Sequence, residues 1–265
     1  MKLKSFLITA AALLLFANSY TVKASAVTKP PKRQYYQLIV YHVANKSHEQ
    51  RLDKYLSEAF LPALHRQGIK TIGVFKTANM DTATNKRMYV LIPFSSLTAF
   101  GDLENTIAKD KELAQKGSDY INAPNNDAPY TRKESILMQA FEGMPQLKQP
   151  EFEEPKTERI YELRSYESAT EKLYKNKVEM FNVDEMEIFE RIGSKPVFYG
   201  EVIAGSRMPN LMYMTSYSNK TSRDEQWKKF GSDPKWKEIS GMEKYKNNMD
   251  KADVMFLSPT AYSDY

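Results

Sequence analysis

The sequence predicts an α+β protein in which two tandem ferredoxin-like βαββαβ units pack as one pseudo-dimeric α+β barrel. Three observations lead to this prediction. The chain carries an internal repeat, each copy has the same order of predicted strands and helices, and the strands are too apolar on both faces for one face to remain in water. A chain of 265 residues has room for two such units.

The internal repeat consists of matching segments at nearly constant spacing. Tyr36-Gln-Leu-Ile-Val-Tyr41 matches Tyr161-Glu-Leu-Arg-Ser-Tyr166 at an offset of 125 residues. Met88-Tyr-Val-Leu-Ile92 corresponds to Met212-Tyr-Met-Thr-Ser216 at an offset of 124. Because the offset drifts so little along the chain, the pattern favours a duplication. Weaker matches pair residues 65–68 with 190–193, Asp110 with Asp233, and Leu113 with Trp236.

The first copy spans residues 34–141. Ser47 is predicted to begin a capping box at the start of its first helix. Pro62 should kink or restart that helix because proline removes an internal hydrogen bond. Gly68 lies where a left-handed helix terminus favours glycine. The predicted strands are 36–43, 70–77, 87–94 and 135–141, and the second helix is 97–116.

The second copy, residues 159–259, repeats this order. Its first helix has a predicted break at 182–184, and Gly193 takes the place of Gly68. Asp233-Pro234 should restart its second helix, with Asp at the cap and Pro in the first turn. A proline-rich segment, residues 142–158, is predicted to be an extended linker between the copies. The predicted strands are 160–168, 196–203, 211–217 and 254–257, and the second helix is 222–251.

The N-terminus has the pattern of a secretory signal peptide. Lys2 and Lys4 precede an apolar run at residues 6–17, and Ala24-Ser25-Ala26 provides a small-x-small cleavage site. The run is shorter than the roughly 18–20 residues that span a bilayer. We therefore expect cleavage near Ala26, residues 1–26 being the signal peptide, and an exported, periplasmic or secreted protein without a membrane span.

Charge and composition exclude several classes of function. The net charge of +5 falls to +2 without the three lysines of residues 1–26, so a nucleic-acid partner is not expected. The absence of cysteine excludes disulfides, thiolate nucleophiles and zinc-thiolate sites. The three histidines lack the spacing of a helical metal site, and no nucleotide-binding or hydrolase motif occurs. No metal or cofactor is therefore expected.

The second copy resembles a known family in three segments. Tyr161-Glu-Leu-Arg-Ser-Tyr166, Glu190-Arg-Ile-Gly193 and Asp233-Pro-Lys-Trp236 are similar to the marks of the NIPSNAP family. The resemblance covers about residues 159–259 well and residues 34–141 weakly. It implies a dimeric α+β barrel fold, and the family has no settled general activity. In the first copy Gln37, Ile39 and Leu113 replace Glu162, Arg164 and Trp236, so a site is expected mainly in the second copy.

Five residues of the second copy are candidates for ligand binding. Glu162 and Arg164 are two residues apart on a strand and therefore share one face, which we expect to line the barrel. Arg164 could grip a carboxylate or phosphate with its planar fork, and Glu162 could orient it or act as a base. The alternative is an internal salt bridge. Three tyrosines, Tyr166, Tyr199 and Tyr213, could orient a polar ligand or simply pack.

Two functions follow from these features. The first is a non-catalytic binding module for a small ligand or a protein partner, because no catalytic set is recognisable. The alternative is a cofactor-independent enzyme acting on a small anionic or aromatic compound in the barrel cavity of the second repeat. Either function is compatible with a monomer that contains an internal pseudo-dimer or with a homodimer. The sequence names neither the ligand nor the pathway.

Overall fold

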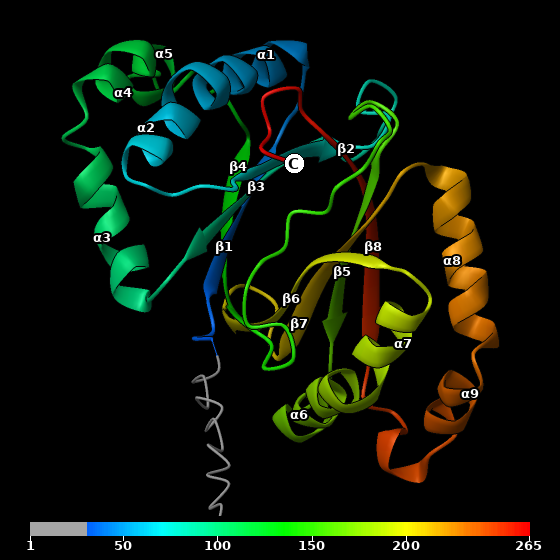
Figure 1. The fold of residues 1–265 in the computed structure, drawn as a ribbon. Helices are drawn as coiled ribbons and strands as arrows, with labels where there is room; N and C mark the ends of the chain where they lie inside the picture. The colour runs from blue at the N-terminus through cyan, green and yellow to red at the C-terminus, as the bar shows by residue number, and fades with distance from the viewer. Residues whose placement is uncertain (1–30) are drawn as a thin grey trace, which may run out of the picture. The chain divides into compact units, whose positions relative to one another are not determined.

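Eight antiparallel strands close into a barrel at the centre of the computed structural model, which describes residues 31–265 (Figure 1). Around the barrel the order is β1-β3-β2-β8-β5-β7-β6-β4. Each half of the chain supplies four adjacent strands, and the halves meet where β2 pairs with β8 and β4 pairs with β6. The predicted signal peptide lies outside the described residues. The strands are β1 Tyr35–His42, β2 Gly73–Thr77, β3 Arg87–Phe94, β4 Arg132–Ala140, β5 Ile160–Glu167, β6 Lys195–Ala204, β7 Asn210–Tyr217 and β8 Lys251–Pro259.

Two groups of helices lie on different sides of the barrel, one from each half of the chain (Figure 1). Among the described residues, no helix combines the length and the apolar character needed to cross a membrane. The first group is α1 Lys46–Tyr55, η1 Leu56–Phe60, α2 Leu61–Arg66, α3 Leu97–Ile107, α4 Lys111–Lys116 and α5 Ser118–Ile121. The second group is α6 Glu171–Met180, η2 Phe181–Glu185, α7 Met186–Arg191, α8 Lys220–Ser232, α9 Pro234–Ser240 and η3 Glu243–Tyr245.

Local sequence signals explain most of the helix ends. The predicted restart at Pro62 is confirmed, since Pro62 lies in the first turn of α2 after the π-helical turn η1. Asp233 caps α9 as predicted, accepting from the backbone N–H groups of Lys235 and Trp236. The capping box predicted at Ser47 is wrong, because the side chain of Asn45 caps α1 by accepting from His48 N–H. Asparagine at this position satisfies a free backbone donor as well as serine does.

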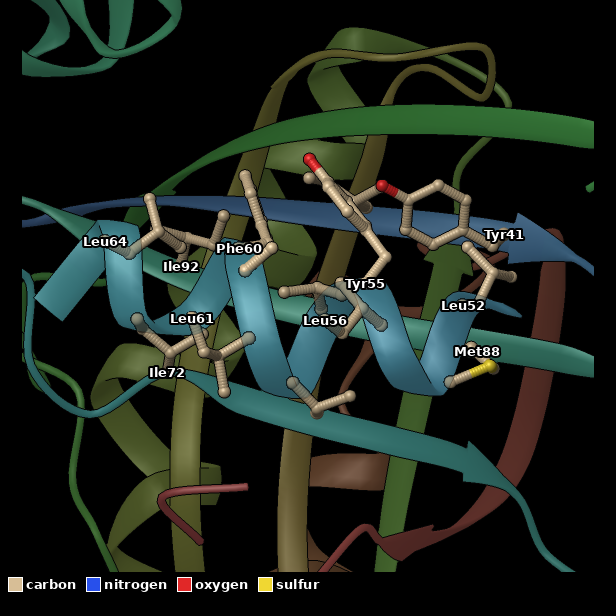
Figure 2. Close-up of a cluster of buried hydrophobic side chains, with 14 of the residues drawn as sticks. Tyr41, Leu52, Tyr55, Leu56, Phe60, Leu61, Leu64, Ile72, Met88 and Ile92 are labelled. Atoms are coloured by element: carbon tan, nitrogen blue, oxygen red, sulfur yellow. The ribbon is translucent and has the colours of Figure 1, made fainter. Parts of the chain in front are cut away.

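The hydrophobic core has three parts. One fills the barrel interior and includes Tyr36, Leu38, Tyr161 and Leu163. The other two lie on the outer face of the barrel, each under the helices of one half. Figure 2 shows the part in the first half, where the helical run from α1 to α2 packs on the strands. Full burial of each large apolar side chain contributes about 1.5–3 kcal/mol, so all three layers stabilise the fold.

The strand pairing corrects the alignment of the two halves. Tyr41 pairs with Met88 across β1 and β3, and Tyr166 pairs with Leu211 across β5 and β7. Met88 therefore occupies the position of Leu211, and the predicted match of Met88 with Met212 is wrong by one residue. A slip of one residue moves a side chain to the opposite face of a strand. Met88 indeed packs in the outer core, whereas Met212 packs in the barrel interior.

Candidate functional site

Glu162 and Arg164 lie on the outer face of β5, beneath α8, and the prediction that they line the barrel interior is wrong. The neighbouring residues Tyr161 and Leu163 point into the barrel instead. Both faces of β5 are buried, one by the barrel core and one by helices. For this reason, the presence of charged residues on one face did not identify which face is inward.

The carboxylate of Glu162 is the centre of a closed hydrogen-bond network. It is fully buried and accepts from Arg164 Nε at 2.5 Å, from Arg223 Nε at 2.5 Å and from Trp227 Nε1 at 3.1 Å. The guanidinium of Arg164 lies 3.7 Å from the centroid of the Trp227 ring, so cation–π attraction reinforces the ion pair. A buried carboxylate needs such partners, and Glu162 has them from within the chain.

Tyr166 and Tyr213 complete the network. Arg164 Nη1 donates to the Tyr166 hydroxyl at 2.8 Å, and that hydroxyl is 2.9 Å from the Tyr213 hydroxyl. Burial opposes the charged form of Arg164, but the neighbouring tyrosines and Glu162 outweigh it and raise the pKa of the guanidinium. Four of the five candidates are thus brought together, and each polar group is already engaged within the protein.

Tyr199 lies on the outer face of β6, next to but outside this network. Its ring stacks on Tyr213 at 5.6 Å between centroids, and burial raises the pKa of its hydroxyl well above the ordinary value. The hydroxyl has no hydrogen-bond partner among the described residues. Tyr199 and Ser194 line a surface hollow of about 270 Å³ beside α7. The structure therefore separates Tyr199 from the other four candidates.

A cavity of about 70 Å³ opens at the end of the barrel where β1 and β5 finish. The opposite end is filled by aromatic side chains, including Tyr36, Phe75 and Tyr161. Both halves of the chain line the cavity, which combines an apolar wall with a polar rim. The wall is Leu38, Val40, Tyr89, Ile136, Leu163, Met212 and Met255, and the rim is Arg87, Glu134, Ser165, Gly205, Ser206, Arg207, Asn210 and Asp253.

Arg87 differs from the other charged residues of this rim. Glu134 is 2.5 Å from His42 Nε2, and Arg207 pairs with Asp253 and lies 3.5 Å from Glu167. Arg87 forms no ion pair within residues 31–265, and its buried Nε has no hydrogen-bond partner there. Burial raises the pKa of the adjacent Tyr89, an effect that the positive charge of Arg87 partly offsets.

Arg87 was not among the residues singled out from the sequence. It begins β3 in phase with Tyr89 and Leu91, which both point into the barrel. A single charged residue that alternates with apolar residues on the inward face of a strand indicates a binding residue in the barrel. This signal can be used only once the inward face is known. Elsewhere in the described chain, no cluster of three or more His, Asp or Glu residues could hold a metal ion.

The comparison with protein families finds a match in the second half of the chain. The NIPSNAP family model matches residues 161–264, which contain the whole Glu162–Arg164–Trp227 network. We call residues 161–264, which this family model matches, the NIPSNAP domain. This domain supplies Leu163, Ser165, Asn210 and Met212 to the cavity at the barrel end, and the first half of the chain supplies Arg87 and the facing wall.

Solved structures share the fold across most of the chain. A candidate monooxygenase from Lactobacillus acidophilus NCFM has 12% identity and a TM-score of 0.55, with 86% of this chain and 94% of that chain covered. A second candidate monooxygenase, from Fusobacterium nucleatum subsp. nucleatum, has 10% identity and a TM-score of 0.53, with 86% and 93% covered. A NIPSNAP family protein from Agrobacterium tumefaciens str. C58 covers 45% of this chain and 98% of its own, at 18% identity and a TM-score of 0.37. A search of curated proteins found no match.

Proposed function

We propose that the protein is a binding module for a small carboxylate, held in the cavity at the barrel end with its anionic group on Arg87. The observation that carries this proposal is that Arg87 has no ion-pair partner within residues 31–265, and no partner there for its buried Nε, at a cavity whose other rim charges are paired. Arg87 is half-buried, and a charge held partly out of water without an ionic partner favours an anion from solution.

The shape of the cavity supports a short ligand with an apolar body. A guanidinium presents a planar fork that matches a carboxylate in two parallel hydrogen bonds. The apolar wall of the cavity consists mainly of aliphatic and methionine side chains, among them Leu38, Leu163 and Met255. A volume of about 70 Å³ leaves room for a few carbon atoms, since one water position takes about 10–15 Å³. Butyrate is a suitable probe of this class.

A cofactor-independent enzyme is the alternative function. His42 and Glu134 lie 2.5 Å apart near the same rim, an arrangement that can serve a general base. Two of the structures that cover most of the chain are named as candidate monooxygenases. At 12% and 10% identity this likeness supports the fold alone, so it does not favour that reaction over binding. Neither Glu162 nor Arg164 is free to act on a ligand in this proposal.

The proposal also includes the organisation of the chain. The strand orders β4-β1-β3-β2 and β8-β5-β7-β6 support two ferredoxin-like units at residues 34–141 and 159–259, joined by the linker 142–158. Because both seams of the barrel lie within one chain, a monomer with an internal pseudo-dimer is favoured. The N-terminal sequence pattern supports export with cleavage near Ala26.

Calorimetric titration with butyrate tests the proposal. The wild-type protein should bind the probe, and Arg87→Gln should weaken binding by about tenfold or more, since a charge-assisted bidentate contact is lost. Arg207→Gln is the matched control, because Arg207 lies on the same rim but already has acidic partners. Equal affinity in wild type and Arg87→Gln contradicts the proposal. Chemical change of a bound compound during incubation would favour the enzyme instead, and failure to bind any small acid would favour a protein partner.

A further inference from the structure

A second hollow, independent of the barrel end, lies between α3 and the outer face of the first-half strands. Its volume is about 410 Å³. It opens because α3 packs loosely, with no residue fully buried. Figure 2 shows Tyr55 and Phe60 extending from the helical run toward the strands, with Tyr41 of β1 beside Tyr55. All three aromatic side chains line this hollow. The remaining lining residues include Gln37, Ile39, Phe100, Leu103, Ile107 and Tyr120.

The strand pairing shows which residues of the NIPSNAP domain occupy the corresponding positions. Ser96 caps α3 two residues after β3 ends, and Asn219 caps α8 two residues after β7 ends. Counting from these caps places Glu104 of α3 at the position of Trp227 in α8. Ile39 on β1 lies at the position that Arg164 has on β5. Each of these two residues pairs with the same position of the neighbouring strand, which is β3 in the first half and β7 in the second.

The same space is filled in one half and hollow in the other. In the NIPSNAP domain, the indole of Trp227 covers the guanidinium of Arg164 at 3.7 Å and donates to Glu162. In the first half the side chain at the helix position, Glu104, is exposed, and the strand position carries the shorter Ile39. Within residues 31–265, the helix position that Trp227 occupies in the other half therefore carries no ring, and the residues around the hollow include Tyr41, Tyr55 and Phe100.

Two charged residues line the hollow, and burial lowers the pKa of Lys133 while the negative charge of Glu104 partly offsets this effect. Glu104 projects from α3, and Lys133 lies on β4, 5.8 Å from the centroid of the Tyr41 ring. Within residues 31–265, neither of these two side chains forms an ion pair. A ligand that carries an ammonium and a carboxylate group complements this pair of rim charges.

We propose that this hollow binds a free aromatic amino acid, with its ring in the place that Trp227 fills in the other half. The tyrosine and phenylalanine walls offer edge-to-face and stacked contacts to such a ring. The ammonium group of the ligand faces Glu104 and its carboxylate faces Lys133. The site shares no residue with the barrel-end cavity, so this proposal does not depend on the proposed carboxylate site.

Titration of the full chain with L-tryptophan, followed by NMR of the ligand and by calorimetry, tests this inference. L-tryptophan should bind, and indole, tryptamine and indole-3-acetate should bind more weakly because each lacks one or both charges. Glu104→Trp should weaken L-tryptophan binding by about tenfold or more by filling the hollow from the helix. Ile39→Phe fills it from the sheet and serves as a second variant, and thermal unfolding shows which variants are folded.

One further variant makes the outcome specific. Arg87→Gln should leave L-tryptophan binding unchanged, which distinguishes this site from the barrel end. Absence of L-tryptophan binding to wild type, or equal binding to wild type and folded Glu104→Trp, overturns the inference. Equal affinity for indole-3-acetate and L-tryptophan overturns the role of Glu104.

Discussion

Replacement of Glu162 by alanine should destabilise the protein strongly, because this carboxylate is the shared acceptor for two arginines and a tryptophan. The side chains of Arg164 and Arg223 are only 14% and 17% exposed, so water can replace the lost acceptor only in part. Removing one partner of a buried ion pair costs about 3–5 kcal/mol. We expect the loss to fall in this range and not above it, because Arg164 keeps Tyr166 and Arg223 keeps Asp224.

Urea unfolding monitored by tryptophan fluorescence measures the change in the free energy of unfolding. Gln37→Ala is the matched control, since Gln37 occupies the corresponding position in the first half and its side chain bonds only Ser135 Oγ, in an exposed pair at 2.8 Å. The control should lose less than about 1 kcal/mol. Arg164→Ala should lie between the two, because Glu162 then keeps Arg223 and Trp227. A loss below about 1 kcal/mol in Glu162→Ala would refute the assignment of this network as a structural one.

Two more perturbations have outcomes that the structure fixes. Burial raises the pKa of Asp233, but hydrogen bonds from Arg191 and from the backbone of α9 outweigh it, so the pKa lies below the ordinary 3.8. This contribution to stability is present above that value and is lost as the pH falls through the lowered pKa. The free energy of unfolding of Asp233→Asn should therefore be lower than that of wild type at neutral pH, and this difference should shrink in acid. Urea titrations measure it, and a difference that stays constant from pH 7 to pH 2 would count against the Arg191 pair. Gly193 has φ +77° with open space around its Cα, so Gly193→Ala should cost about 1–2 kcal/mol from backbone strain alone, and a stabilising effect in thermal unfolding would contradict this.

Local signals in the sequence predicted much of the framework. Gly68 and Gly193 have the predicted left-handed conformation, with φ of +78° and +77°. Asp233 and Pro234 begin α9 as predicted. Helical and strand periodicities located the main elements because each depends on neighbours in the chain. The NIPSNAP resemblance, read from three short segments, agrees with the family match over residues 161–264.

The orientation of the strands could not be predicted in the same way. Both faces of β1 and β5 are buried, so alternation of residue types does not tell the barrel side from the helix side. This is why Arg164 was expected at the cavity and Arg87 was not. Arg223, one of the two partners of Glu162 in α8, is 61 residues away in the chain, and nothing in the local pattern connects them. Long-range pairing decides which charges are satisfied, and the structure is needed to see it.

The central claim is that Arg87 is available to an anion at the barrel end. Side-chain NMR of ¹⁵N-labelled arginine during a butyrate titration tests it most directly, because the Nε–H of Arg87 is the group that lacks a partner among the described residues. The account predicts a saturable shift of the Arg87 resonance while the Arg164 and Arg223 resonances stay fixed. An Arg87 resonance that does not move at saturating butyrate, or shifts confined to exposed arginines such as Arg207, would contradict it.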